Sequence, residues 1–510
     1  MTGGRLRAGD GTVVLRALEL VQAADWSQFL DKQRWFGDRG ATDPSVRVAV
    51  PLSWGDGALA IAQIAVRSGG QEALYQVPVA ARPVHAENVP ERAVIASVEV
   101  QGALLTVFDA VEDPAFQRGL ADALASGVVA VDESSGTRFV TESLTDKRLV
   151  VPEQAAIRVG SAEQSNTSLI FDREAIFKLF RKLESGVHPD VEVSEFLALR
   201  AGFAHTPMML ATARFEGNGT RTIAGALQEF MPDSRDAWSH AIEIAAPYFT
   251  APPGDQNPAN GFLADARRIG LVTREMHEAL ATDDDDPAFA PEPATAGDLD
   301  RWAQRTQQMI RDATALLERR LSDIPRERSG EAKVLIQRRD RYHGWVNEIV
   351  DELGDDLGAR TRTHGDYHLG QVLRTASHDF VVIDFEGEPA RSLEERREKT
   401  SPLRDVAGML RSVGYAAASL AKSIETTSDL STRELRAGRW ERDVRGAFLG
   451  GYLERTHGRS GLLPSDEAHV RSLIALFETE KAYYELAYEL NHRVDWVGIP
   501  MRGISKLLVR

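Results

Sequence analysis

The chain has 510 residues, enough for two or three domains, and its hydrophobic content of 43% and charged content of 27% are typical of a soluble globular protein. The formal net charge of −16 argues against a nucleic-acid-binding protein and against a polybasic membrane protein, so we expect neither partner. The absence of cysteine excludes disulfides, thiolate catalysis and cysteine-ligated zinc. Residues 1–10 contain no apolar signal core, and no stretch approaches the roughly 20 apolar residues of a transmembrane helix, so a cytoplasmic location is expected.

The first predicted domain covers residues 1–108. Helical periodicity over residues 18–30 is followed by stretches that are typical of strands and are separated by Gly and Pro. These stretches lie at residues 46–50, 58–66, 73–79 and 104–108. No group of residues in this part indicates a reaction, so we interpret it as a scaffold or cap domain.

A β-rich domain is predicted for residues 109–232. It begins with a helix at 109–124 and continues with short strands at 156–159, 168–171 and 175–180. The loop between the first two strands is rich in small and hydroxyl-bearing residues, which can offer N–H groups and hydroxyls to phosphates. The candidate contacts in it are Gln164, Ser165, Asn166, Thr167 and Ser168. The loop lacks the Gly-x-x-x-x-Gly-Lys-Ser/Thr pattern, so a Walker-type NTPase is not indicated.

Lys178 lies in the third of these strands, where alternation places its two apolar neighbours on one face and Lys178 on the other. Most lysines in strands are exposed charges at a sheet edge. A lysine in this position can also bind the α and β phosphates of a nucleotide, provided that a carboxylate holds it. Pro189 opens a predicted helix at residues 190–200, and Glu192 in this helix is our choice for the partner, with Glu195 as the alternative.

An apolar strand that ends at Pro232 is typical of a hinge between two lobes. The backbone of Gln228, Glu229 and Phe230 in this strand can pair with the edge of an adenine. The C-terminal domain that follows, residues 233–510, is predicted to be mainly helical. Its first helices are expected at residues 238–248, 265–281, 298–321 and 334–353.

The central stretch of this domain is Thr-His-Gly-Asp-Tyr-His-Leu-Gly-Gln at residues 363–371, followed by an apolar strand and by Ile-Asp-Phe-Glu at 383–386. A hairpin between them brings Asp366, Gln371 and Asp384 together. Phosphoryl transfer needs such a set: a carboxylate that orients an acceptor hydroxyl and takes its proton, and oxygen ligands for Mg²⁺ on the ATP phosphates. A single aspartate in a turn is usually only a local cap. The whole constellation favours a phosphoryl-transfer site.

At these residues the sequence resembles the kinase superfamily that includes protein kinases and aminoglycoside phosphotransferases. Those proteins carry a His-x-Asp-x-x-x-x-Asn loop and an Asp-Phe-Gly turn. In this chain Gln371 stands in place of the Asn and Glu386 in place of the Gly, which argues against a protein kinase and for a small-molecule kinase. The resemblance implies an α+β fold with two lobes, a β-rich N-lobe and a helical C-lobe.

Further motifs narrow the resemblance to the actinobacterial maltokinases. They are Trp-Phe at residues 35–36, Glu-Gln-Ser-Asn-Thr-Ser at 163–168, His-Gly-Asp-Tyr-His-Leu-Gly-Gln at 364–371, Asp-Phe-Glu-Gly-Glu-Pro-Ala-Arg at 384–391, Arg-Asp-Val-Ala-Gly-Met-Leu-Arg-Ser at 404–412, and the tail Arg-Val-Asp-Trp at 493–496 with Ile-Pro at 499–500. The resemblance spans nearly the whole chain. It implies an N-terminal cap on a two-lobed kinase, with ATP and Mg²⁺ as cosubstrates and maltose phosphorylated to maltose 1-phosphate.

The same resemblance implies Asp366 as the catalytic base, Gln371 and Asp384 as metal ligands, and Lys178 on the phosphates. A glucosamine or aminoglycoside kinase on the same scaffold is the alternative, because few pocket residues change the substrate of such a fold. A catalytically silent pseudokinase that acts as a binding scaffold is the alternative of another class. The oligomeric state is left open.

The acceptor sugar is expected against a helix at residues 472–491. One face of this helix carries Lys481, Tyr484 and Tyr488, with Glu485 and Glu489 beside them. Aromatic side chains suit a disaccharide, whereas carboxylates suit the ammonium group of an amino sugar. An amphipathic core helix with ordinary ion pairs is the alternative interpretation. The full set of candidate acceptor contacts is His368, Arg404, Asp405, Lys481, Tyr484, Glu485, Tyr488, Glu489, Arg493 and Trp496.

Overall fold

The computed structural model divides into two compact units, which are described separately. Unit 1 comprises Met1–Glu195 and Pro207–Pro232, and unit 2 comprises Phe196–Thr206 and Asp233–Arg510. The predicted domain boundaries at residues 108 and 232 stay predictions. The structure describes residues 11–507 except 55–57, 85–88, 148, 153–155, 161–164, 251–259, 284, 389–390, 424–429 and 455–460.

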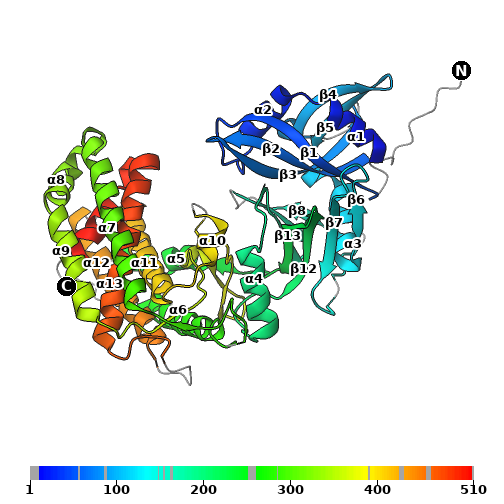
Figure 1. Ribbon diagram of the computed structural model, residues 1–510. Helices are drawn as coiled ribbons and strands as arrows, with labels where there is room; N and C mark the ends of the chain where they lie inside the picture. Colours follow the sequence, from blue (N-terminus) through cyan, green and yellow to red (C-terminus); the bar gives the residue numbers. More distant parts are fainter. Residues whose placement is uncertain are drawn as a thin grey trace, which may run out of the picture. The chain divides into compact units, whose positions relative to one another are not determined.

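The first sheet of unit 1 is antiparallel and has the strand order β1-β2-β3-β5-β4. Long apolar runs in β2 and β3 are buried along most of their length, because both faces of the sheet are covered. Helices α1 (Gly11–Leu20) and α2 (Ala23–Lys32) pack with the sheet into one apolar core (Figure 1). The strands are β1 (Thr42–Leu52), β2 (Ala58–Ser68), β3 (Gln71–Pro83), β4 (Val94–Val100) and β5 (Ala103–Asp109).

The second sheet of unit 1 has the order β6-β7-β12-β13-β10-β9-β8. Its apolar residues share a core with the other face of the first sheet and with helix α3 (Pro114–Ser126), so burial of one apolar region stabilises both sheets. Its strands are β6 (Val129–Val131), β7 (Arg138–Ser143), β8 (Ile157–Val159), β9 (Thr167–Phe171), β10 (Ala175–Leu179), β12 (Met209–Gly217) and β13 (Thr220–Glu229).

The two sheets are joined through the segment that follows β10. Strand β11 (Lys182–Leu183) leaves the second sheet and pairs with β3 of the first. The intervening Arg181 is buried, forms an ion pair with Asp109 at 2.8 Å and donates from Nε to the hydroxyl of Thr167 at 2.8 Å. A buried guanidinium is stable only with such partners. Arg181 therefore ties strands β9 and β10 to the first sheet.

Unit 2 is mainly helical, and the long helix α13 lies at its centre. This helix buries apolar residues over most of its length and packs against α7, α9, α11 and α14. The carboxylate of Asp466 caps its N-terminus by accepting from the N–H of Ala468. The helices are α5 (Ala237–Thr250), α6 (Asn260–Ala279), α7 (Ala296–Arg319), α8 (Ser329–Gln337), α9 (Arg339–Leu353), α10 (Leu393–Arg397), α11 (Leu403–Ser423), α12 (Leu430–Tyr452), α13 (Glu467–His492) and α14 (Gly498–Leu507).

Short strands position the central motif within unit 2. Strands β17 (Val372–Arg374) and β18 (Phe380–Val382) form the predicted hairpin, and β14 (Arg235–Asp236) pairs with β17. A second short pair, β15 (Glu292–Pro293) and β16 (Ala359–Arg360), precedes the motif. The hairpin register places Val372 opposite Val382, so the residues on either side of these strands meet.

The α+β fold class is confirmed, and several predicted helices differ in extent. The helix predicted at residues 18–30 is two helices, α1 and α2, and the helix predicted at 109–124 begins only at Pro114. The helix predicted at residues 334–353 is two helices, α8 and α9, with a break at Arg338 that no Gly or Pro marks. The helix predicted at 190–200 is helix α4 (Pro189–Glu195) followed by a π-helical turn, Phe196–Arg200. Across the described residues, no helix combines the length and apolar character needed to cross a membrane.

Candidate active site

The loop that carries Asp366 is held by a buried carboxylate from α11. Asp405, which is 2% exposed, accepts the N–H of His364 at 2.8 Å and the N–H of Gly365 at 3.0 Å. Nε2 of His277, on α6, lies 3.1 Å from the same carboxylate. Burial by itself raises the pKa of the Asp405 carboxyl, but the His277 hydrogen bond and the backbone donors lower the pKa below its ordinary value. The predicted contact of Asp405 with an acceptor stays a prediction; the structure shows that Asp405 holds the loop and also lines a cavity of unit 2.

Asp366 follows a glycine whose conformation the loop requires. Gly365 has a φ of +85°, and a Cβ on it would lie 3.0 Å from Cα of Gly387. The catalytic loop and the loop after β18 therefore approach each other as closely as backbones allow. Asp366 then faces a cavity of about 730 Å³ in unit 2.

The hairpin brings the two predicted metal ligands into contact. The N–H of Ile383 donates to the carbonyl of Gln371 at 3.0 Å, and Nε2 of Gln371 donates to Asp384 at 2.7 Å. Asp384 has a φ of +71°, a conformation that non-glycine residues rarely adopt outside turns and functional sites. A carboxylate oxygen of Glu386 lies within 4.8 Å of one from Asp384. Carboxylate and amide oxygens are the ligands that Mg²⁺ prefers, so these three residues fit this ion.

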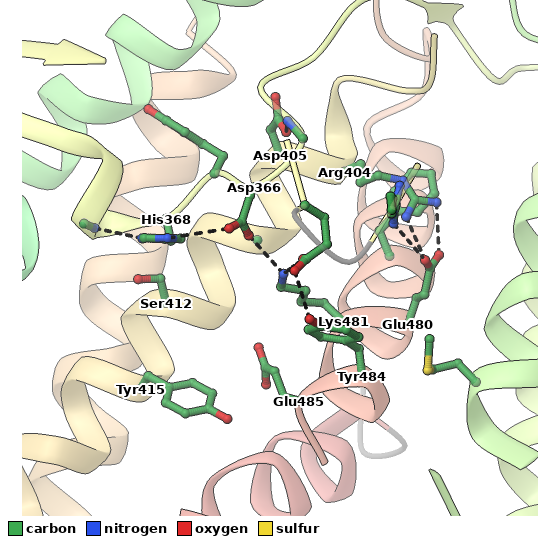
Figure 2. Close-up of a pocket in the computed structure, with 18 of the residues that line it drawn as sticks. Asp366, His368, Arg404, Asp405, Ser412, Tyr415, Glu480, Lys481, Tyr484 and Glu485 are labelled. Atoms are coloured by element: carbon green, nitrogen blue, oxygen red, sulfur yellow. Dashed lines mark hydrogen bonds and ion pairs between the residues drawn. The ribbon is translucent and has the colours of Figure 1, made fainter. Parts of the chain in front are cut away.

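Helix α13 contributes a cation to the same cavity. Nζ of Lys481 lies 3.2 Å from Asp366 and 2.8 Å from Glu388, and the hydroxyl of Tyr484 donates to Glu388 at 2.9 Å (Figure 2). Burial opposes the charged form of Lys481, but the carboxylates of Asp366 and Glu388 raise the pKa of the ammonium group above its ordinary value. Lys481 is therefore charged when it contacts the candidate base.

Several predicted acceptor residues already have strong partners within the protein. Arg404 forms a two-pronged ion pair with Glu480, at 2.8 and 3.0 Å. Glu485 accepts from Nε of Arg411 at 3.0 Å. Such pairs at the wall of a cavity hold the side chains in place, so they shape the acceptor cavity in addition to any contact they make with a ligand.

The structure brings eight of the ten predicted acceptor residues to the wall of the 730 Å³ cavity. The other two lie further along α13. Tyr488 is 44% exposed and its ring lies 4.6 Å from the ring of His492, and Glu489 is buried between Arg493 and Tyr415. Tyr488, four residues after Tyr484, shares its helical face, and Glu489 lies beside that face, but neither side chain lines the cavity. The eight residues are His368, Arg404, Asp405, Lys481, Tyr484, Glu485, Arg493 and Trp496.

Sequence reasoning missed other residues that line this cavity. Glu388 lies in the Asp-Phe-Glu-Gly-Glu motif, two residues after Glu386, and its acidic character there was the available signal. Glu480 precedes Lys481 on α13, but nothing in the sequence indicates that it faces the cavity. The further lining residues include Asp236, Trp238, Arg305, Met309, Arg391, Ser412 and Tyr415.

The residues predicted to contact nucleotide phosphates belong to unit 1. Lys178 lies in β10 directly opposite Ser168 of β9 and Ala226 of β13, so it shares a face of the sheet with both. Its Nζ lies 3.3 Å from the carboxylate of Asp190, which is almost fully buried. The structure shows Asp190, in the first turn of α4, as a partner of Lys178, whereas a role for Glu192 or Glu195 stays a prediction.

The rest of the predicted nucleotide contacts are strand-end residues. Thr167 begins β9 and accepts from Arg181, and Ser165 and Asn166 precede it, whereas Gln164 lies outside the described residues. At the predicted hinge, the N–H of Glu229 donates to the carbonyl of Met208 and that of Phe230 to the carbonyl of Glu174, each at 3.0 Å. These two N–H groups are engaged within the protein. Pairing with an adenine edge would therefore need the carbonyls of Gln228 and its neighbours or a rearrangement of these bonds.

The Asp190 contact leads to a prediction that separates Asp190 from Glu192. Asp190→Asn should weaken ATP binding about tenfold or more, as Lys178→Met should, because the lysine loses a charged partner. Glu192→Gln, a matched loss of charge two residues away, should change ATP affinity little. Equilibrium titration with Mg·ATP measures both. A strong effect of Glu192→Gln with none from Asp190→Asn would return the role to Glu192.

The loop with Asp366 and the Gln371–Asp384 pair lie in unit 2, and the Lys178–Asp190 pair lies in unit 1; these are the kinds of groups that a phosphotransferase of kinase-like architecture needs. Residues 29–113 match the family model of the maltokinase N-terminal cap domain, which confirms the predicted cap. The glucosamine kinase of Mycolicibacterium smegmatis (strain ATCC 700084 / mc(2)155) is 28% identical over 351 residues, covering 68% of this chain and 78% of that protein. The glucosamine kinase of Streptacidiphilus jiangxiensis is 25% identical over 401 residues, covering 76% and 81%.

Solved structures agree on the fold. A glucosamine kinase (crystal form B) superposes with a TM-score of 0.65 at 22% identity, covering 96% of this chain and 99% of that chain. A glucosamine kinase in complex with glucosamine, ADP and inorganic phosphate gives a TM-score of 0.63 at 21% identity, covering 96% and 100%. The predicted kinase-like fold with an N-terminal cap is therefore confirmed, and the chain is related to sugar kinases.

Proposed function

We propose that the protein is an ATP-dependent kinase that phosphorylates a hydroxyl group of a sugar. The observation that carries this proposal is Asp366, whose carboxylate faces the 730 Å³ cavity while the buried Asp405 holds the loop around it. A carboxylate at the wall of a ligand-sized cavity is where an acceptor hydroxyl can bind. The same constellation argues against a catalytically silent scaffold, because each group that phosphoryl transfer needs is present.

In this proposal Asp366 orients the acceptor hydroxyl and takes its proton as the new P–O bond forms. Lys481 forms an ion pair with Asp366 and has Glu388 as a second partner, so it can release Asp366 to the hydroxyl without losing its other ion pair. Gln371, Asp384 and Glu386 would hold Mg²⁺, which neutralises charge on the transferred phosphate. Lys178 would bind the nucleotide phosphates, held by Asp190.

We propose maltose as the acceptor, because the geometry favours a neutral sugar. The carboxylates expected to bind an ammonium group are already engaged: Glu485 with Arg411, Glu489 with Arg493, and Asp405 with backbone N–H groups. Replacing such a contact by one to the ammonium group of a ligand gains little free energy. Six aromatic side chains, a residue type that suits the faces of sugar rings, line the cavity: Trp238, Tyr367, Tyr415, Phe477, Tyr484 and Trp496.

Glucosamine is the second candidate, and the relatives favour it. Both curated relatives and both full-length structural neighbours described above are glucosamine kinases. In this alternative Asp366 and Glu388, which share the single cation of Lys481, would supply the negative charge for the ammonium group.

A panel of acceptors tests the proposal. Phosphate transfer from ATP should require Mg²⁺ and should be fastest to maltose, with NMR showing phosphate on the anomeric hydroxyl. Glucose, glucosamine and kanamycin should be poorer, because a site that hydrogen-bonds a hydroxyl discriminates strongly against an analogue that cannot fill it. If phosphate transfer is fastest to glucosamine and yields a 6-phosphate, glucosamine and not maltose is the acceptor. Transfer to none of these sugars would contradict the assignment as a sugar kinase.

A further inference from the structure

A second cavity adjoins the acceptor cavity in unit 2. Its volume is about 540 Å³, and it shares Arg305, Glu388, Arg391 and Arg404 with the wall of the first. On its other side it reaches Thr363 and Gly387, at the two loops that carry the catalytic motif. We call it the arginine cavity, because guanidinium groups dominate its wall.

The charge of this cavity opposes that of the whole chain. Among the described residues that line it, seven are basic and four are acidic, whereas the protein carries a net charge of −16. Some of the basic side chains have carboxylate partners outside the cavity, as Lys399 does with Glu292 at 2.7 Å. Arg311 differs from these, because it donates to the neutral amide oxygen of Gln308. A concentration of positive charge in an anionic protein indicates that this surface attracts anions.

Three arginines gather where the two cavities meet. They surround the carboxylate of Glu480: Arg404 at 2.8 Å, Arg305 at 3.0 Å and Arg391 at 3.7 Å. Glu480 is 4% exposed. The carboxylates of Glu388 and Glu395 also line both cavities and supply further negative charge near these arginines.

Two further features distinguish the arginines of this group. Burial lowers the pKa of Arg391 below its ordinary value, and the neighbouring Arg404 and Arg305 lower it further. Nε of Arg404 is buried and has no hydrogen-bond partner among the described residues. Both features are expected of a site that binds an oxyanion, because planar guanidinium groups donate two hydrogen bonds to carboxylate and phosphate oxygens.

We propose that the arginine cavity binds an oxyanion, the phosphate or carboxylate group of a small molecule, next to the acceptor. Two sources share this chemistry. The anion is either a group on the molecule that occupies the acceptor cavity or a free anion such as inorganic phosphate. Binding at this site needs no phosphoryl transfer, so the proposal stands or falls independently of the acceptor assigned above.

Arg391→Gln is the variant that tests the proposal. It removes the arginine furthest from Glu480 and leaves Arg404 and Arg305 to pair with that buried carboxylate, so the fold should persist. Titration calorimetry of the full chain with inorganic phosphate should show binding, and the variant should raise the Kd about tenfold or more, as expected for loss of a charged hydrogen bond. Phosphate should also raise the Tm of the unaltered protein and not that of the variant. Without phosphate, the variant should be at least as stable, because it relieves repulsion among like charges.

Arg471→Gln is the matched control. Arg471 lies on α13, is mostly exposed and pairs with Glu467 on the same helix. Its replacement therefore removes the same charge without changing the wall of the arginine cavity. Phosphate affinity that is equal in Arg391→Gln and the unaltered protein, or reduced as much by Arg471→Gln, would overturn the proposal. So would the absence of binding by the unaltered protein to phosphate, glucose 6-phosphate and glucuronate.

The same titrations distinguish the two sources of the anion. If inorganic phosphate binds equally well with and without saturating maltose, the site binds a free anion beside the acceptor. Glucose 6-phosphate or glucuronate that binds more tightly than inorganic phosphate, and displaces maltose, would assign an anionic group on the acceptor itself. In either case Arg391→Gln should weaken the binding.

Discussion

Asp366→Asn should lower kcat by about 10²–10⁴-fold while Mg·ATP still binds, because the variant keeps the shape of the side chain but cannot accept the proton of the acceptor hydroxyl. The fold should be unaffected, since Lys481 retains Glu388 as an ion-pair partner at 2.8 Å. Steady-state kinetics with saturating ATP and sugar measure kcat, and a nucleotide titration measures the retained affinity.

Asp443→Asn provides the control for this prediction. Asp443 lies on α12, is partly exposed and pairs with its neighbour Arg442, so its change removes the same charge away from the cavity. Its kcat should match that of the unaltered protein. Near-normal turnover by Asp366→Asn would show that Asp366 is not the catalytic base.

Asp405→Asn should lower kcat by about 100-fold although Asp405 is not expected to touch the reacting atoms, because a shift of the loop by about 1 Å misplaces Asp366. The amide can accept only one of the two N–H groups of His364 and Gly365, and its NH₂ group would face the other donor. Leaving that buried N–H unsatisfied should reduce the free energy of unfolding by about 1–3 kcal/mol. Urea denaturation measures this loss, and kinetics should show a fall in kcat with little change in KM for ATP.

Asp323→Asn is the matched control, because Asp323 is partly exposed and pairs with Arg320 on the surface of unit 2. It should change neither the free energy of unfolding nor kcat appreciably. Asp405→Asn with normal stability and normal kcat would show that the loop holds its conformation without the carboxylate. Lost stability with normal kcat would show that Asp405 supports the fold but does not position Asp366.

The parts of the site that sequence reasoning predicted are those that lie close together along the chain. Gln371 and Asp384 are separated by one short hairpin, and the apolar run at residues 380–383 between them is enough to predict that they meet. Gly365 is likewise a local feature, because the residue before Asp366 has a positive φ that favours glycine. Local spacing determines such contacts, because a two-stranded hairpin has a register set by its own turn.

The break between α8 and α9 shows the limit of this reasoning for the fold. Apolar periodicity continues across Arg338, and neither Gly nor Pro marks the change of direction. Packing of each helix against different neighbours in unit 2 overrides the continuous pattern, since tertiary burial outweighs the weak local preference of a few residues.

By itself, the sequence determined the central loop, the hairpin after it, the strand with Lys178 and the helical face of Lys481 and Tyr484. Only the tertiary structure decided which side chains meet across these elements. Lys178 forms an ion pair with Asp190, Arg404 pairs with Glu480, 76 residues away, and Asp405 accepts backbone N–H groups of the central loop. Helical and strand periods define which face a residue occupies, but the partner on that face depends on how distant elements pack, and charged side chains settle where burial leaves them a counter-charge.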